Sequence, residues 1–328
     1  MATIAVTGGT GHIGGVLVHR LVELGHDVRV LSYKGERGLS ADLPNVQFID
    51  GDIRDRDSLR GFLDGAEQLF HLAAQISIDG DLGGLVPAIN VDGAAAVAET
   101  ALEIGVGRMV HFASIHAFDQ HPTNEPLDET RQRATAGHHL AYDQSKALGE
   151  LRVREVIARG LDAVIVHPTG VIGPMDAEPS RMGRVWLDLY HRRLPALVDG
   201  HFNWVDARDV VEGALAAMEK GRTGESYILG GHHHSVTTIA DMAEAATGVK
   251  RPGFVTPMPL ARIFVPLQAA FDKARGKIPV NTSEALKALS GNRDMRIDKA
   301  RQELGYNPRP TEDSVRDIYA WFEQNGYL

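Results

Sequence analysis

The feature that most constrains this chain is a glycine-rich loop close to its first residue. The stretch TGGTGHIG, Thr7 to Gly14, directly follows an apolar run at 3–6 and directly precedes apolar residues at helical spacing up to Leu24. An apolar strand, a tight glycine turn and an amphipathic helix in succession begin a βαβ unit, because the helix returns the chain to a parallel neighbouring strand. We therefore expect a parallel sheet from the first residues onward.

The same alternation continues through the first half of the chain. The predicted strands are 3–6, 27–31, 46–49, 68–72, 108–112, 163–167 and 225–229, and further helices are predicted near 56–64, 87–104 and 140–158. Gly25, Gly105 and Gly160 follow three of the helical patterns and suit a left-handed helix cap. These features predict an α/β fold, a Rossmann-type doubly wound parallel sheet.

The pattern changes after Pro168. An irregular stretch rich in glycine and proline runs to about Gly200. A helix is predicted to start at Asp209, which with Glu212 forms a capping pair, and the remainder of the chain is mostly helical. We assign residues 1–171 with 201–231 to the doubly wound domain. Residues 172–200 and 232–328 are assigned to a smaller, mostly helical C-terminal lobe that would bind a substrate over the strand ends.

Composition excludes several classes of function. The 328 residues include no cysteine, which removes disulfides, thiolate metal sites and cysteine nucleophiles. A net charge of −9 argues against a nucleic-acid partner. No run of uncharged apolar residues reaches the length of a membrane span, and the first strand leaves no room for a signal peptide. We expect a cytoplasmic protein with a small-molecule partner and no membrane partner.

The glycine loop predicts a dinucleotide site. Gly8, Gly11 and Gly14 lie between strand and helix, where backbone N–H groups and the helix N-terminus face an anion and no Cβ obstructs a pyrophosphate. Thr10, His12 and Ile13 belong to the same loop. We therefore expect a nicotinamide dinucleotide to bind here.

The end of the second predicted strand bears on the choice of cofactor. An NAD site commonly carries an acidic residue there, whereas this chain has Ser32, Tyr33 and Lys34, with Arg37 close by. NADP(H) is favoured and NAD(H) stays open. Asp52, after the third strand, would either accept from the adenine amino group or cap a helix.

A tyrosine and a lysine supply the acid–base chemistry. Tyr142 and Lys146 are four residues apart at the start of a predicted helix, so they share one face. A nearby ammonium group favours the phenolate and lowers the pKa of the phenol toward a usable range.

Together, these residues resemble the extended branch of the short-chain dehydrogenases/reductases, the NAD-dependent epimerase/dehydratase family. HLAA at 71–74, NVDGAAAV at 90–97 and RMVHFAS at 108–114 agree with that resemblance, as do 300–306 and 320–326. It implies that Ser114 polarises a substrate carbonyl, Tyr142 passes the proton, and Lys146 binds the nicotinamide ribose and tunes the phenol. The further cofactor contacts that it implies are Ile53, Leu72, Ala73, Ala74, Asn90, Pro168, Thr169, Gly170 and Val171.

Within the family, the local sequence is similar to dihydroflavonol 4-reductase. Ser114 is followed by Ile115 and His116 rather than by the Asp-Glu pair of sugar dehydratases, and HPTGVIGP at 167–174 lacks the asparagine of many sugar-nucleotide enzymes. The resemblance implies an NADP(H)-dependent reductase of ketones or aldehydes. His116, Met175 and Trp204 are candidate substrate contacts.

Two other functions stay open, and the sequence also bears on oligomeric state and on metal binding. A nucleotide-sugar epimerase is supported by arginines that suit a diphosphate, namely Arg181, Arg184, Arg192, Arg193 and Arg208. A non-catalytic cofactor-sensing protein is the alternative outside catalysis. The resemblance also implies a homodimer through the helix that carries Tyr142. We expect no metal at His232–His234, because neighbouring side chains of an extended chain point to opposite sides.

Overall fold

A seven-stranded parallel sheet forms the centre of the computed structural model, which describes residues 1–328 except 78–79, 138 and 266–282. In spatial order its strands are β10 (Ser226–Leu229), β6 (Ala163–Pro168), β5 (Arg108–Phe112), β4 (Gln68–His71), β1 (Thr3–Thr7), β2 (Asp27–Ser32) and β3 (Val46–Asp50). The order reverses beside β1, so that β1 and β4 flank a switch point where a crevice opens at the carboxyl ends of the strands. The predicted doubly wound fold is confirmed.

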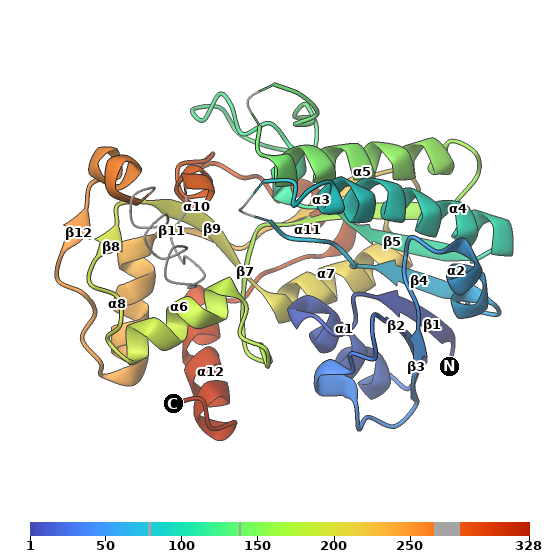
Figure 1. The fold of residues 1–328 in the computed structure, drawn as a ribbon, viewed down its shortest axis with the longest axis horizontal. Coiled ribbons are helices and arrows are strands. Elements are labelled where there is room, and N and C mark those ends of the chain that lie inside the picture. Colours follow the sequence, from blue (N-terminus) through green and yellow to red (C-terminus); the bar gives the residue numbers. More distant parts are fainter. Residues whose placement is uncertain (78–79, 138, 266–282) are drawn as a thin grey trace.

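Helices cover both faces of this sheet (Figure 1). On one face lie α2 (Arg56–Leu63), α3 (Leu85–Pro87), α4 (Ala94–Ile104) and α5 (Ala141–Ile157). On the other face lie α1 (His12–Glu23), α7 (Ala207–Lys220) and α11 (Asp298–Leu304). Short turns complete the connections, namely η1 (Gly38–Ser40), the π-helical turn η2 (Ala88–Gly93) and η3 (Ile115–Ala117). Arg20 of α1 and Glu212 of α7 join the second layer through an ion pair of 2.8 Å.

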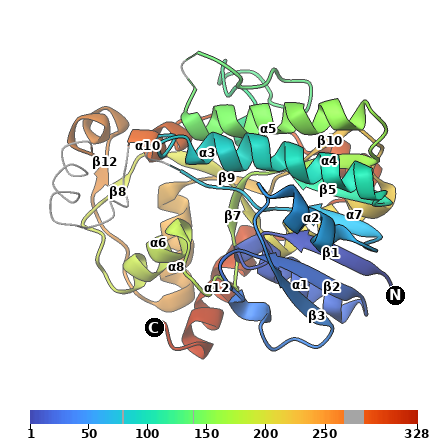
Figure 2. The same ribbon diagram turned by 45° about the vertical axis from the view of Figure 1, so that its right-hand side comes forward.

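A smaller region lies beyond the carboxyl ends of the strands (Figure 2). Its strands are β7 (Gly170–Ile172), β8 (Leu197–Val198), β9 (His201–Asp206), β11 (His232–Ser235) and β12 (Val255–Thr256). Its helices are α6 (Arg181–Tyr190), α8 (Val236–Thr247), α10 (Ser283–Ala288) and α12 (Thr311–Gln324). β9, which the sequence assigned to the doubly wound domain, pairs with β7 and β11 in a small three-stranded sheet.

The two regions share one core. A single buried apolar cluster runs from Val6 in β1 through Ile228 in β10 to Phe322 in α12. Because this cluster is continuous, the helical region packs onto the sheet without a separate core of comparable extent. The domain boundaries drawn from the sequence stay a prediction.

Helix ends follow the expected chemistry in all but one place. Gly25, Gly105 and Gly160 have positive φ angles of 79°, 82° and 112°, as left-handed caps require. α7, however, begins at Ala207 and is capped by Asp206, whose carboxylate accepts from Arg208 N at 2.8 Å. The predicted capping role of Asp209 is wrong, because its carboxylate instead accepts from the Arg309 backbone N and Nε, both at 2.9 Å.

One helical stretch in the described part of the chain has the length and composition of a membrane span. It covers Leu85–Ile104, 20 residues with a hydropathy of 1.2, and includes Asp92, Glu99 and Glu103. Its α4 segment packs between α2 and α5 against the sheet (Figure 1). That setting is the one a core helix of a globular protein occupies.

A close backbone contact sets the position of α5. A Cβ on Gly149 would lie 2.0 Å from the carbonyl oxygen of Asn90 in η2, so only glycine lets the helix approach this near. The Asn90 side chain then donates to Ser145 Oγ of α5 at 2.9 Å and to Gln75 O at 3.0 Å, and it accepts from Gln75 N at 2.7 Å. Asn90 therefore ties the segment after β4 to α5.

We predict that Gly149→Ala lowers the free energy of unfolding by about 1–3 kcal/mol, because the added methyl group meets backbone that has no room to move. Gly61→Ala is the matched control, since a Cβ at this exposed position of α2 meets nothing within 4 Å. The control should gain about 0.5–1 kcal/mol from helix propensity. Urea unfolding of both variants measures the difference, and equal stabilities would contradict the packing argument.

Candidate functional site

A cavity of about 890 Å³ lies at the carboxyl ends of the strands. Most of the residues predicted from the sequence line it. They are Gly8, Thr10, Gly11, His12, Ile13, Gly14, Tyr33, Asp52, Ile53, Leu72, Ala73, Ala74, Ser114, His116, Tyr142, Lys146, Pro168, Thr169, Gly170 and Val171. Five predicted residues are not part of its lining, namely Ser32, Lys34, Asn90, Met175 and Trp204.

The glycine loop forms a cradle whose shape fits a pyrophosphate. Gly8 has a φ of +71°, and a Cβ there would lie 2.6 Å from Ala73 N, whereas a Cβ on Gly14 would lie 2.0 Å from Gly8 O. These two glycines are needed for the chain to pack on itself. A Cβ on Gly11 would meet only Gly8 O at 3.5 Å, which is no clash. Glycine at this position therefore keeps the cavity open, because no side chain projects into it.

The helix that follows presents its N-terminus to this cradle. No side chain caps α1 at Gly11, which leaves the first N–H groups of the helix for a ligand. His12 Nε2 donates to Pro174 O at 2.9 Å and so joins the loop to the segment after β7. The donor set and the missing side-chain cap fit the diphosphate of a dinucleotide.

At the end of β2, the polar groups are mostly occupied by protein partners. Ser32 is buried and its Oγ donates to Glu36 O and accepts from Arg37 Nη1 at 2.8 Å. Arg37 also pairs with Asp50 at 2.9 Å. Lys34 is exposed and has a positive φ of 53°. Lys34 is therefore better placed than Arg37 to meet an added phosphate without losing an ion pair.

Asp52 does not cap a helix, and its contact with the adenine amino group stays a prediction. Asp55 caps α2, while the Asp52 carboxylate accepts from Arg54 N at 2.9 Å and from Arg54 Nε at 3.0 and 3.1 Å. The hydrogen bond from Arg54 holds the pKa of Asp52 below its usual value. Arg54 and Glu36 also line the cavity, and sequence reasoning missed both, because isolated charges after a strand are common on surfaces.

Ser114, Tyr142 and Lys146 meet on one wall of the cavity. Ser114 lies two residues after the end of β5, and its Oγ caps η3 by accepting from His116 N at 3.2 Å. Tyr142 and Lys146 lie on the first turns of α5, and all three side chains line the cavity. Lys146 Nζ donates to Phe112 O at 2.7 Å. The three side chains predicted as catalytic are thus brought together by β5 and α5.

The electrostatics of this wall differ from the sequence expectation. Burial raises the pKa of Tyr142 to about 12, the Ser114 hydrogen bond lowers it in part, and the Asp143 charge raises it further. Burial lowers the pKa of Lys146 to about 8, against an opposing effect of Glu150. Lys146 is not among the groups that shift the pKa of Tyr142 in this structure, and its ammonium group donates to the Phe112 carbonyl.

Beneath Lys146, a buried ionic network holds α5. Glu150 has no exposed surface and accepts from Arg133 Nη2 and from Arg154 Nε, both at 2.8 Å. Burial alone would raise the pKa of Glu150, but these cations and His167 hold it below its usual value. His167 of β6 has a ring nitrogen 3.0 Å from Ser114 O and another 3.1 Å from Ser226 Oγ. The network links the helix of Tyr142 to the strand end of Ser114.

The predicted substrate contacts divide into two groups. His116 lines the cavity, as do Phe202, Met182 and Arg181, the last of which is one of the arginines noted in the sequence. Trp204 is buried, and its Nε1 donates to His234 O at 3.2 Å. Met175 packs against the core with a positive φ of 68°.

The histidine run lies apart from the cavity. His232 Nε2 donates to Arg309 O at 3.1 Å, and His234 Nε2 lies 3.1 Å from Thr311 Oγ1, so both rings hold the segment before α12. His233 instead approaches His201, with ring centroids 5.0 Å apart. Within the described residues, no group of three or more metal-ligating side chains gathers.

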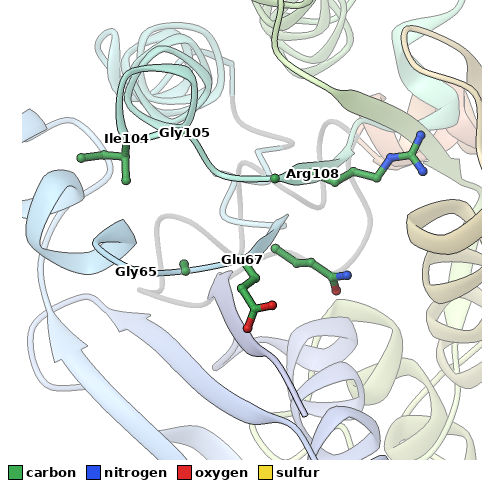
Figure 3. A pocket seen from close by; sticks show the side chains of 8 residues that line it. Gly65, Glu67, Ile104, Gly105 and Arg108 are labelled. Atoms are coloured by element: carbon green, nitrogen blue, oxygen red, sulfur yellow. The ribbon is translucent and has the colours of Figure 1, made fainter.

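A second hollow of about 560 Å³ lies at the opposite edge of the sheet, where β4 and β5 begin (Figure 3). Figure 3 shows Arg108 and Glu67 turned away from each other. Arg108 Nη1 donates to Met218 O at 3.1 Å, and Glu67 Oε1 accepts from Thr3 N at 3.0 Å. Because its charged groups serve the fold, this hollow is not a second candidate for the active site.

Comparison with known proteins gives consistent results. The profile of the NAD dependent epimerase/dehydratase family matches residues 4–230. Sterol demethylase protein B of Methylococcus capsulatus is 35% identical over 99% of this chain and 100% of its own length. A Synechocystis protein named "Putative dihydroflavonol 4-reductase" is 31% identical over 98% of this chain and 95% of its own. The crystal structure of gox2253 superposes with a TM-score of 0.85 at 32% identity and covers 100% of both chains.

We predict that Lys146→Met changes how stability depends on pH. The folded pKa of about 8 lies below the ordinary value of 10.5, so between these values the unfolded chain binds a proton that the folded protein does not. The unfolding free energy of the unaltered protein should therefore rise by about 2 kcal/mol from pH 8 to pH 10 relative to the variant. Urea unfolding at both pH values measures this, with exposed Lys250→Met as control. Parallel curves for the protein and Lys146→Met would contradict the buried titration.

Proposed function

The chain belongs to the NAD-dependent epimerase/dehydratase family, the extended branch of the short-chain dehydrogenases/reductases, and from this premise we propose that it is an NADP(H)-dependent carbonyl reductase resembling dihydroflavonol 4-reductase. Members of this branch are NAD(P)-dependent enzymes that act on small molecules. The proposed reaction is hydride transfer between NADP(H) and a ketone or aldehyde, whose reduced form is a secondary or primary alcohol.

One observation carries the proposal: Ser114, Tyr142 and Lys146 line the same cavity as the glycine cradle. In the reducing direction, the glycine cradle would hold NADPH, whose chemistry is to donate a hydride to the carbonyl carbon and so become NADP⁺. Ser114 Oγ would hold the carbonyl oxygen by a hydrogen bond. Tyr142 would deliver its phenolic proton to that oxygen as the carbon–oxygen double bond becomes single.

The protonation state of Tyr142 favours reduction. With its pKa raised to about 12, the phenol is protonated at neutral pH and ready to act as an acid. Lys146 would bind the nicotinamide ribose. Its ammonium group would then leave Phe112 O for the ribose hydroxyls, which would bring its positive charge closer to the phenol of Tyr142.

The walls of the cavity suit a hydrophobic carbonyl compound. Phe202, Met182 and Leu85 line it from three separate elements of the chain. The two curated relatives described above carry names that refer to sterol and dihydroflavonol chemistry, which is apolar, ring-based chemistry. A preference for NADP(H) is supported by Lys34 and by the lack of a carboxylate at 32–34. The homodimer would use α4 and α5, which lie side by side on one face (Figure 1).

We predict that Tyr142→Phe lowers kcat by about 100-fold or more and leaves the Kd for NADPH nearly unchanged, because the ring stays and only the proton donor is lost. The measurement is NADPH consumption with a panel of aldehydes, aryl ketones, flavanonols and steroids, together with a fluorescence titration of the cofactor. Tyr190→Phe, outside the cavity lining, is the control and should keep full activity. A Tyr142→Phe enzyme that retains most of its turnover would refute the assignment.

We predict that Lys34→Asn raises KM for NADPH by about tenfold and KM for NADH by less than about twofold, because one charged hydrogen bond to the 2′-phosphate is lost. Asparagine is chosen since it tolerates the positive φ at this position. Lys250→Asn, an exposed lysine away from the cavity, is the control. The NADP(H) preference is wrong if the unaltered enzyme uses NADH better than NADPH at equal concentration.

A further inference from the structure

A chain of buried hydrogen bonds leads from two arginines to the backbone carbonyl of Ser114. His167 has no exposed surface, and its Nδ1 lies 3.0 Å from Ser114 O while its Nε2 lies 3.1 Å from Ser226 Oγ of β10. The Ser226 hydroxyl accepts from Arg154 Nη2 at 2.7 Å and from Arg133 Nη2 at 3.4 Å. Of these residues only Ser114 lines the cavity, so the chain approaches the catalytic wall from inside the protein.

The partners of His167 decide which of its ring nitrogens carries the proton. A carbonyl oxygen can only accept, so the bond to Ser114 O requires a proton on Nδ1. Burial lowers the pKa of His167 to about 4, so at neutral pH the ring has one proton and Nε2 is an acceptor. Ser226 donates to that nitrogen, because the guanidinium groups of Arg154 and Arg133 occupy the lone pairs of its oxygen. Every donor in the chain therefore points toward Ser114.

Glu150 offers the ring proton a competing position. Its Oε2 lies 3.7 Å from His167 Nε2, and both side chains are fully buried. If Nε2 had no donor, this carboxylate would draw the ring proton onto it, and the lone pair of Nδ1 would then face Ser114 O. The hydroxyl proton of Ser226 occupies the Nε2 lone pair and so prevents that exchange. Ser226 therefore selects the tautomer that can bind the Ser114 carbonyl.

The bond from His167 acts on the residue that would bind the substrate carbonyl. Ser114 has an extended backbone, with φ −165° and ψ 154°, and its carbonyl oxygen also accepts from Ala117 N at 2.9 Å. Its Oγ accepts from His116 N at 3.2 Å, which leaves the hydroxyl proton for a ligand. Because the carbonyl and the hydroxyl belong to one residue, loss of the His167 bond would let the peptide plane turn and the hydroxyl move with it.

We propose that His167 and Ser226 are positioning residues, which hold the Ser114 hydroxyl in its catalytic place through the proton on His167 Nδ1. The role of Ser114 in this inference rests on the proposed function, whereas the direction of the hydrogen-bond chain does not. A buried histidine that served only to fill space would not depend on which of its nitrogens carries the proton.

Two polar substitutions of His167 separate the direction of the hydrogen bond from polarity alone. The side-chain amide of asparagine reaches the place of Nδ1 and donates to Ser114 O, whereas that of glutamine reaches the place of Nε2 and leaves the carbonyl without this donor. We expect His167→Asn to keep kcat within about threefold and His167→Gln to lower it by about tenfold or more, since a misplaced hydroxyl slows the reaction.

The assay is NADPH consumption by the full-length protein with the best substrate of the carbonyl panel. The Kd for NADPH should stay within about twofold in both variants, because His167 lies outside the cavity lining. Urea unfolding verifies that the two variants are folded.

The tautomer is measured without any substrate, by nitrogen NMR of protein labelled in its histidines. A ring nitrogen that carries a proton and one that does not have clearly different shifts, and His167→Asn identifies the signals of His167 by their loss. We expect the proton on Nδ1 in the unaltered protein. Ser226→Ala should move it to Nε2, toward Glu150, and should lower kcat as well.

A second histidine–hydroxyl pair provides the matched control. His234 Nε2 lies 3.1 Å from Thr311 Oγ1, the same separation as in the His167–Ser226 pair, and neither His234 nor Thr311 lines the cavity. His234→Gln should leave both kcat and the Kd for NADPH unchanged.

Two results would overturn the inference: a ring proton on Nε2 of His167 in the unaltered protein, or the same kcat in His167→Asn and His167→Gln. If the unaltered enzyme reduces no member of the carbonyl panel, the proposed reductase function fails. The inference is then decided by the tautomer and by the nitrogen shift of the Ile115 amide, which shares a peptide group with Ser114 O. That shift should change in His167→Gln and stay in His167→Asn, and the opposite pattern would contradict the positioning role.

Discussion

Glu150 is a carboxylate without exposed surface, and its ion pairs determine where the active-site helix lies. A buried charge of this kind is very costly unless it is paired, so Arg133 and Arg154 have to stay in place for the fold to persist. The helix that carries Glu150 stays with them. One turn toward the N-terminus lies Lys146, and one turn further lies Tyr142. The positions of both functional groups are thus set by charges that never meet a ligand.

The same network reaches the other half of the catalytic wall. His167 bridges Ser114 O and Ser226 Oγ, so the ends of β5, β6 and β10 are tied to α5 through polar groups within the core. The close approach of Gly149 to Asn90 fixes the helix from its opposite side. Ser114, Tyr142, His116 and Asp143 all lie on the two elements joined in this way. The wall of the pocket that carries these side chains is therefore held rigidly, as selective hydrogen bonding to a ligand requires.

Much of the fold could be predicted because local patterns and tertiary structure agree. The predicted strands match the observed ones within a residue or two, since apolar runs of this length fit only a buried parallel sheet. The glycine loop and the Tyr142–Lys146 pair were also predictable, because both depend on residues close in sequence. The cap of α7 was not, because Asp206 and Asp209 are equally good by local chemistry. Arg309 decides between them from far along the chain.

By itself, the sequence determined the doubly wound sheet, the glycine loop between β1 and α1, and the Tyr142–Lys146 pair, because each is encoded by spacing within a few residues, whereas Ser114 was implied only by the family resemblance. Only the tertiary structure decided how those groups are charged and which others join them. In the folded protein, Lys146 donates to Phe112 O and Trp204 is buried in the core. Asn90 binds Ser145 outside the cavity lining, and His116 lies next to Asp143. Those outcomes depend on burial and on contacts between elements distant in sequence, and neither can be predicted from a local residue pattern.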